Sequence, residues 1–122
     1  MKREVFFRLC VNRKRGGLVA VKEEGYIYTF YAQDGNDLKE MKFALEKNGT
    51  SYIRITEIDT GMCADGHETQ KYTTYKSLVD FLRNDPNYIN TIYKLREKNK
   101  KYVKILSDLI LEGKIEEGQF YK

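Results

Sequence analysis

The C-terminal third of the chain, from residue 85 to residue 112, reads DPNYINTIYKLREKNKKYVKILSDLILE. Asp85 and Pro86 are typical of a helix start, because Asp caps free N–H groups and Pro tolerates the first helical position. Apolar side chains then recur at alternating spacings of four and three, which is the pattern of a heptad seam. The seam positions are Tyr88, Ile92, Leu95, Asn99, Tyr102, Leu106 and Leu109. The pattern predicts one long C-terminal helix that the rest of the chain packs against.

The centre of this helix is polar, since residues 97–101 read EKNKK. One alternative is therefore a pair of helices broken near Asn99. A buried Asn at a seam position fixes register and oligomer state in paired helices. Residues Ile92, Leu95, Asn99, Tyr102 and Leu106 accordingly predict a homodimer seam, and the other alternative is that the seam packs on the protein's own sheet.

The composition indicates one globular domain spanning residues 1–122, with 41% hydrophobic and 33% charged residues. A net charge of +4 and a pI near 9.0 are compatible with a nucleic-acid partner without requiring one. Cys10 and Cys63 cannot form a disulfide framework, and the chain has neither an apolar leader nor a long apolar run. We therefore expect a reduced, cytoplasmic protein that makes no membrane contact.

In the first half of the chain, aliphatic side chains alternate with other side-chain types, as they do in β-strands. The alternation and the intervening turns predict strands at 5–11, 18–22 and 26–32, with a turn at Glu23-Glu24-Gly25 between the second and third. Three strands in this order predict an antiparallel meander. Further strands are expected at 51–58 and, less regularly, at 68–73.

Two short helices complete the expected fold. Asp37 and Glu40 have the spacing of a capping box, which predicts a helix ending at Asn48 and Gly49. Thr74 is a second N-cap candidate, before a helix that runs to about residue 82. The fold class expected is α+β: a three-stranded meander plus one or two strands, packed by two short helices and the long one. Residues 1–73 are mostly sheet with one helix, 74–113 helical and 114–122 a tail.

On the expected strands, one set of alternate residues is mostly aliphatic, and the other set includes most of the aromatic side chains. Aromatic side chains and arginines on one face are typical of a platform on which single-stranded nucleic acid stacks. The residues of this expected platform are Arg8, Tyr26, Tyr28, Phe30, Tyr52 and Arg54, with Phe6 beside them. The alternative is that a helix or a partner chain covers this face.

A second candidate surface is the hairpin tip with three adjacent cations, Arg13, Lys14 and Arg15. Arginine can grip phosphate oxygens with two parallel hydrogen bonds, so the tip is a candidate phosphate contact. The alternative is a solvated loop. The lysine-rich segment 94–104 could likewise contact a nucleic-acid backbone, although a solvated helix face explains it better.

The sequence offers few residues that could form a metal site or a catalytic site. Cys63 and His67 are four residues apart, but with Cys10 they make only three soft ligands, so we expect no metal and no cofactor. A minor catalytic alternative is a ribonuclease that uses Arg54, Glu57, His67 and Glu68 for acid–base chemistry.

The sequence thus favours a small non-catalytic binding protein. The leading hypothesis is a nucleic-acid or nucleoprotein-binding regulator whose partner is RNA, DNA or a nucleic-acid-handling protein. The competing hypothesis is a protein-binding inhibitor or adaptor, of the kind encoded by a phage or mobile element, that blocks a host enzyme or defence complex by occupying its surface.

Overall fold

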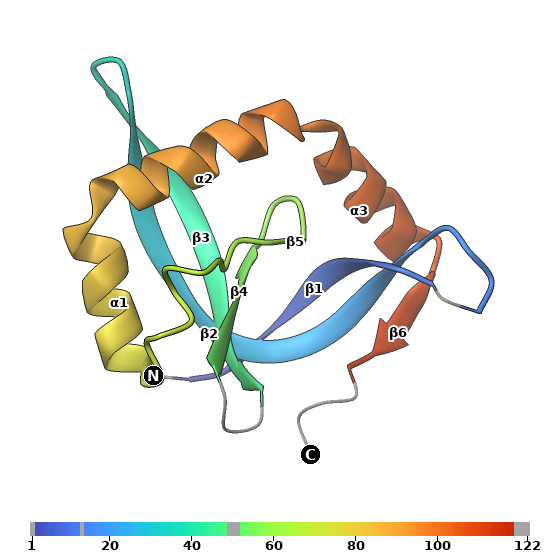
Figure 1. Ribbon diagram of the computed structural model, residues 1–122. Helices are drawn as coiled ribbons and strands as arrows, with labels where there is room; N and C mark the ends of the chain where they lie inside the picture. Colours follow the sequence, from blue (N-terminus) through green and yellow to red (C-terminus); the bar gives the residue numbers. More distant parts are fainter. Residues whose placement is uncertain (1, 13, 49–51, 119–122) are drawn as a thin grey trace.

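The computed structural model describes residues 2–12, 14–48 and 52–118 (Figure 1). Its dominant element is a strongly curved sheet, and three helices form an arc along the sheet. The elements in chain order are β1 (Glu4–Val11), β2 (Leu18–Asp34), β3 (Asp37–Asn48), β4 (Tyr52–Glu57), β5 (Met62–Cys63), α1 (Tyr75–Asn84), α2 (Pro86–Lys98), α3 (Lys101–Leu111) and β6 (Ile115–Glu117).

The sheet is a nearly closed barrel of antiparallel strands in the order β1-β2-β3-β4-β5. Its two ends approach each other where the Leu9 N–H of β1 donates to the Gly61 carbonyl just before β5, at 2.7 Å. β6 joins β2 in parallel, with Ala20 opposite Ile115. The expected α+β meander packed by a long C-terminal helix is therefore wrong. Residues expected to form a tail contribute a strand, and residues 68–73, expected as a strand, form a turn.

β2 is one continuous strand where two strands and a turn were expected. Its first half pairs with β1, ending where Glu4 lies opposite Gly25, and its second half pairs with β3, beginning where Tyr26 lies opposite Leu45. Gly25 lies where the pairing of β2 with β1 ends and its pairing with β3 begins. A Cβ atom there would lie 2.8 Å from the Leu45 carbonyl oxygen. Glycine is therefore needed here because the backbone of β3 comes close where β2 bends, and not because the chain makes a turn.

β3 replaces the helix expected between Asp37 and Gly49. Met41, Phe43 and Leu45 alternate along the chain and are all buried, whereas Leu38, which the helix would have buried, is 66% exposed. The strand period of two thus explains the burial better than the helical period does. Gly35, with φ of 62°, supplies a tight two-residue connection between β2 and β3 at the place where a helix start was expected. Gly49 lies outside the described residues.

The helix starts predicted at Thr74 and Asp85 are confirmed. The Thr74 side chain accepts from the Ser77 N–H at 3.2 Å, and the Asp85 side chain accepts from the Tyr88 N–H at 3.4 Å. The single long helix is wrong: α2 ends at Lys98 and α3 begins at Lys101, so the alternative of a break near Asn99 is the observed arrangement. Within the described ranges, no helix is both long and apolar enough to cross a bilayer.

All three helices pack on the same face of the sheet. α1 and α2 cover a core that includes Phe43, Leu45 and Ile55, while α3 places Leu106 and Leu109 against Ala20 of β2. The opposite face also carries buried side chains, among them Phe6, Val21 and Thr56. Since none of the helices in the described ranges packs on that face, the curl of the sheet itself encloses it. We call it the inner face.

Candidate functional site

Four charged side chains from four strands meet on the inner face. Arg8 on β1 donates through Nε and Nη2 to the carboxylate of Glu23 on β2, at 2.8 and 3.0 Å. Arg54 on β4 donates to Glu46 on β3 through Nε and Nη2, at 2.9 and 2.6 Å. Arg54 Nη2 also lies 2.6 Å from Glu23 Oε2, which joins the two pairs. We call these residues the inner-face ion cluster.

Both carboxylates of the ion cluster are inaccessible, with side-chain exposures of 0% for Glu23 and 1% for Glu46. Burial and the proximity of Glu23 raise the pKa of Glu46 to about 8, although Arg54 opposes the shift. The pKa of Glu23 is lowered instead: burial acts to raise it, but hydrogen bonds from Arg8 and the charge of Arg54 outweigh that effect. One carboxyl is therefore held ionised, while its neighbour binds a proton near neutral pH.

The ion cluster has no room for a substrate at Glu23. A Cβ atom added to Gly118, which follows β6, would lie 2.7 Å from Glu23 Cγ and Oε1. The Gly118 N–H donates to the Lys22 carbonyl at 2.9 Å and holds the chain there. Paired and covered in this way, the ion cluster braces the strands.

The expected stacking platform is divided between the two faces of the sheet. Arg8 lies opposite Val21 and Arg54 lies opposite Glu46, so both arginines are on the inner face. Half-buried Tyr52 shares their parity on β4. Tyr26, Tyr28 and Phe30 belong to the helix-covered face.

The aromatic side chains of β2 are used in packing. Phe30 is buried against Phe43, with ring centroids 5.4 Å apart, and half-buried Tyr28 packs on the same core. Tyr26 meets Tyr75 of α1 edge to face, with centroids 4.9 Å apart. The structure thus does not bring the expected platform residues together on one open surface.

The basic hairpin between β1 and β2 remains open to solvent. Asn12 Oδ1 accepts from the backbone N–H groups of Lys14 and Arg15, at 3.1 and 3.2 Å, which fixes the turn. Both side chains are exposed, and the part of the chain that the structure describes provides neither with an ion-pair partner. Arg13 lies outside the described residues.

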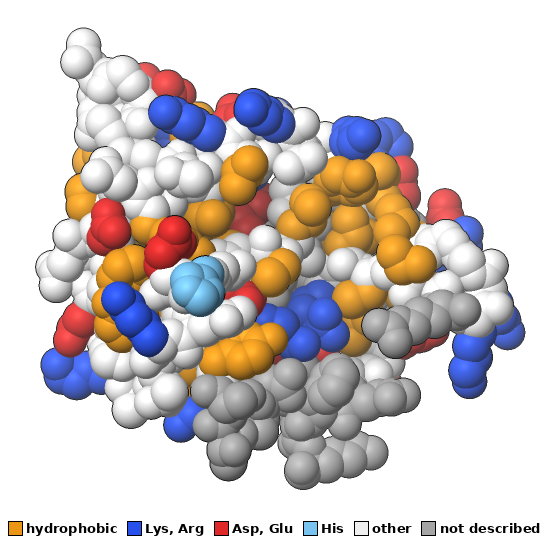
Figure 2. Space-filling model, viewed as in Figure 1, with side chains coloured by type: hydrophobic (Ala, Val, Ile, Leu, Met, Phe, Trp, Pro, Cys, Tyr) orange, Lys and Arg blue, Asp and Glu red, His pale blue; other side chains and the backbone are white. Residues whose placement is uncertain are grey.

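A hollow of about 890 Å³ lies beside this hairpin, between the tip, the end of α3 and β6. Lys14, Arg15 and Lys114 line it together with one carboxylate, Glu116. Figure 2 shows further Lys and Arg side chains along α2 and at the junction of α2 with α3. Among the described cations of α2, α3 and the segment between them, Arg96 pairs with Asp59, Lys100 with Glu97 and Lys104 with Asp108.

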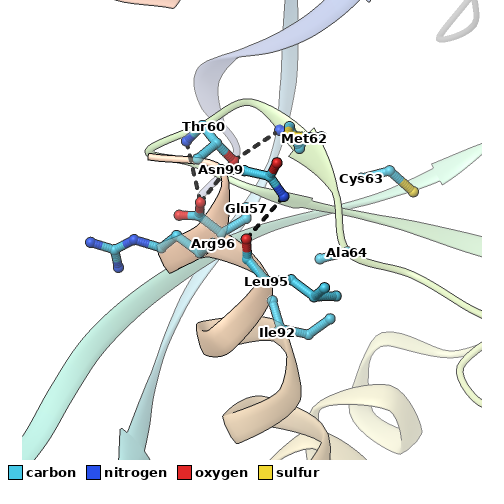
Figure 3. Close-up of a pocket in the computed structure, with 9 residues that line it drawn as sticks. All are labelled: Glu57, Thr60, Met62, Cys63, Ala64, Ile92, Leu95, Arg96 and Asn99. Atoms are coloured by element: carbon cyan, nitrogen blue, oxygen red, sulfur yellow. Dashed lines mark hydrogen bonds between the residues drawn. The ribbon is translucent and has the colours of Figure 1, made fainter. Parts of the chain in front are cut away.

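A smaller cavity of about 120 Å³ lies between α2 and the loop that joins β4 to β5 (Figure 3). Ile92 and Leu95 form its apolar wall, and Glu57 lies at its far side. Both Glu57 oxygens are engaged, since Oε1 accepts from the Thr60 hydroxyl at 2.8 Å and Oε2 accepts from the Asp59 N–H at 2.9 Å. Burial raises the pKa of Glu57. This carboxyl organises the loop that joins β4 to β5.

The residues of the ribonuclease alternative are dispersed. Arg54 is in the ion cluster, Glu57 points to the opposite face of β4, and His67 and Glu68 are exposed in the following loop. Cys63 Sγ donates to Asp65 Oδ1 at 3.0 Å, and burial raises the pKa of the Cys63 thiol to about 11, so the thiol stays protonated. Among the described residues, no group of three metal-ligating side chains gathers.

The residues of the expected dimer seam are divided between α2 and α3. Leu106 is buried against Ala20, and Ile92 packs on the main core. Leu95 is half exposed at the small cavity, and Asn99 Nδ2 donates to the Leu95 carbonyl at 2.9 Å. The apolar seam is thus largely used within one chain.

These observations define a small curled-sheet protein with an internal ion cluster and an exposed basic hairpin. Comparison with protein-family models, with curated proteins and with solved structures finds no match to this chain.

The residues that sequence analysis missed are Glu23 and Glu46, the partners of the sheet arginines. Their signal was a carboxylate inside a strand pattern. Glu46 lies directly opposite Arg54, whereas Glu23 lies opposite Phe6 and reaches Arg8 diagonally. The expected turn at Glu23 and the expected helix around Glu46 concealed this signal.

Proposed function

We propose that the protein is a non-catalytic binding protein that contacts the phosphate backbone of a nucleic acid through its β1–β2 hairpin. The observation that carries the proposal is a contrast between two pairs of cationic side chains. Arg8 and Arg54 are paired with buried carboxyl groups, whereas Lys14 and Arg15 extend from a fixed turn without an ion-pair partner among the described residues. Unpaired cations on a rigid projection suit phosphate oxygens.

The hollow beside the hairpin supports this proposal. Lys114 adds a third cation to its wall, and its volume of about 890 Å³ leaves space for a sugar–phosphate segment. Tyr26, Tyr28 and Phe30 of β2 are committed to packing, so binding here relies on charge and less on base stacking. Such binding is expected to depend weakly on sequence and strongly on salt.

The test measures salt dependence with labelled, mixed-sequence single-stranded RNA, single-stranded DNA and duplex DNA. Lys14→Gln combined with Arg15→Gln should lower the slope of log affinity against log salt by about one unit for each phosphate that the variant no longer neutralises. The matched control is Lys71→Gln with Lys76→Gln, which removes the same charge near α1 and should change the slope much less. A wild-type protein that binds none of the three probes at low salt would contradict the proposal, as would equal slopes for the two double variants.

A separate observation favours the second candidate, a protein-binding inhibitor or adaptor. The β2–β3 hairpin projects beyond the helices (Figure 1), and Tyr31 and Leu38 on it are 56% and 66% exposed. Exposed apolar side chains on a projecting element are typical of protein contacts. Binding through this hairpin would be much less sensitive to salt, which distinguishes it from the leading proposal.

A further inference from the structure

The outer edge of β2 has unpaired main-chain groups. β1 begins at Glu4, opposite Gly25, so it covers no part of β2 beyond that point. β3 pairs with the second half of β2, but along the other edge. Among the described residues, β2 therefore has a neighbouring strand on one side only between Ile27 and Gln33.

The register identifies which groups point outward. The connection between β2 and β3 has two residues, so Asp34 and Asp37 form the hydrogen-bonded pair beside it. Even-numbered residues of β2 consequently bond to β3, while Thr29, Tyr31 and Gln33 direct their N–H and C=O groups away from it.

A contact with α2 supports this assignment. The Gln33 N–H donates to Asn90 Oδ1 at 2.8 Å, so it does point away from β3. For the N–H groups of Thr29 and Tyr31 the described part of the chain provides no comparable acceptor. Asn90 thus caps one end of an otherwise open strand edge.

A groove of about 370 Å³ accompanies this edge. It lies between Thr29 and Tyr31 on one side and the α1–α2 junction on the other, where Leu82 and Pro86 make it apolar. Exposed Arg83, in the last turn of α1, is its one charged lining residue. The groove can seat one apolar side chain, and Arg83 can pair with a carboxylate.

We propose that the edge of β2 from Ile27 to Tyr31 binds an extended peptide segment of a partner protein by strand addition. Evenly spaced main-chain donors and acceptors are satisfied together only by another extended backbone. The groove selects an apolar side chain on that segment, and Arg83 selects an acidic residue beside it. This inference is independent of the proposed phosphate contact, which uses the opposite end of β2.

The test uses a synthetic heptapeptide of alternating valine and threonine with glutamate at both ends. Amide exchange measured by NMR should be rapid at Thr29 and Tyr31 in the free protein and slowed when the peptide is present. A second peptide, N-methylated at the alternate amides that would face β2, should bind at least tenfold more weakly, because each missing hydrogen bond costs about 1 kcal/mol and more than one is lost. The isomer methylated at the remaining amides keeps the N–H groups that would face β2, so it should retain binding.

A pair of protein variants separates the main chain from the side chain. Tyr31→Pro removes an outward N–H that β3 does not use, so the fold should persist while peptide binding falls about tenfold. Tyr31→Ala keeps that N–H and should retain most of the binding. Three results would overturn the proposal: absence of added amide protection at saturating peptide, equal binding by Tyr31→Pro and wild type, or a concentration-dependent dimer that already protects Thr29 and Tyr31.

Discussion

Arg54 on β4 reaches past β3 to Glu23 on β2, with Nη2 2.6 Å from Oε2. In a flat sheet, strands two places apart are separated by about 10 Å, so a direct contact between them needs long side chains on both strands. The same guanidinium also binds Glu46 on the intervening strand. Arg54 therefore ties three adjacent strands together at the bend.

Arg54→Ala should be strongly destabilising. It would leave two buried carboxylates with only Arg8 nearby, and removing one partner of a buried ion pair typically costs about 3–5 kcal/mol. Urea unfolding of the variant and wild type at one pH measures the difference. Lys76→Ala, which breaks the exposed pair with Asp80, is the control and should change stability by less than about 0.5 kcal/mol. Equal effects of the two substitutions would show that the ion cluster contributes nothing.

Stability should fall as the pH rises through neutrality. Folding raises the pKa of Glu46 from its ordinary value of 4.5 to about 8, so the folded state binds this proton more tightly than the unfolded state does. The resulting stabilisation is complete below the unfolded pKa and is lost as the pH rises through 8. The pKa of Glu57 is raised as well, which gives the same sign. Glu23 has the opposite sign, because its lowered pKa supplies stability that is lost only as the pH falls below 4.5.

Glu46→Gln tests this assignment, since glutamine resembles the protonated acid and cannot ionise. The variant should flatten the fall in unfolding free energy between about pH 5 and pH 9. Glu40→Gln on the same strand is exposed and should leave the pH dependence unchanged. If Glu46→Gln retains the full slope, another group is responsible for it.

Tyr28→Ala should lower folding stability by about 2 kcal/mol, because the half-buried ring packs on the main core. Tyr31, on the other face of the same strand, is 56% exposed, and Tyr31→Ala should cost less than about 0.5 kcal/mol. Thermal melts of both variants make the comparison. A stable Tyr28→Ala protein that loses affinity for single strands would restore the stacking hypothesis.

Gly25→Ala should be poorly tolerated. The added methyl group would approach the Leu45 carbonyl oxygen to 2.8 Å and Phe6 Cε1 to 3.1 Å, and overpacking of this kind costs about 1–3 kcal/mol. Gly66→Ala is the matched control, because its nearest neighbour, the Tyr88 hydroxyl, is 3.6 Å away. Chemical denaturation of the two variants should separate them clearly, and similar midpoints would argue against a tight bend at Gly25.

Asn99→Leu should leave the protein monomeric and cost about 1 kcal/mol through loss of the hydrogen bond to the Leu95 carbonyl. Ile92 and Leu106 already pack within the chain, so a leucine between them gains no partner helix. Light scattering across micromolar concentrations measures the assembly state. A dimer in the wild type, tightened in the variant, would support the heptad seam in place of internal packing.

Local signals in the sequence located the helix starts correctly. Thr74 and Asp85 cap helices because their side chains bond to N–H groups three residues on, an interaction confined to a few neighbouring residues. The same reasoning failed at Asp37, where cap-like spacing coincided with a strand. Alternation of Met41, Phe43 and Leu45 was the competing signal, and tertiary burial decided between them.

The placement of candidate site residues depended on register, which the sequence does not reveal. Grouping the arginines and aromatic residues of one parity placed Arg8 on the same face as Tyr28, although the pairing of their strands was unknown. In the structure Arg8 lies opposite Val21, and Tyr28 lies opposite Phe43 on the other face. A shift of one residue in pairing moves every side chain to the other face, so the unknown register of β1 against β2 was enough to group Arg8 with the aromatic side chains.

The division of β2 between two sets of partners also has a consequence for the order of folding. Tyr26 to Asp34 pair with a segment that follows at once in the chain, so this hairpin can close within microseconds. Ala20 pairs with Ile115, and that contact must close a loop containing most of the sequence. Folding is therefore expected to begin at the β2–β3 hairpin and to finish when β6 docks, which makes the docking of β6 the step most sensitive to chain entropy.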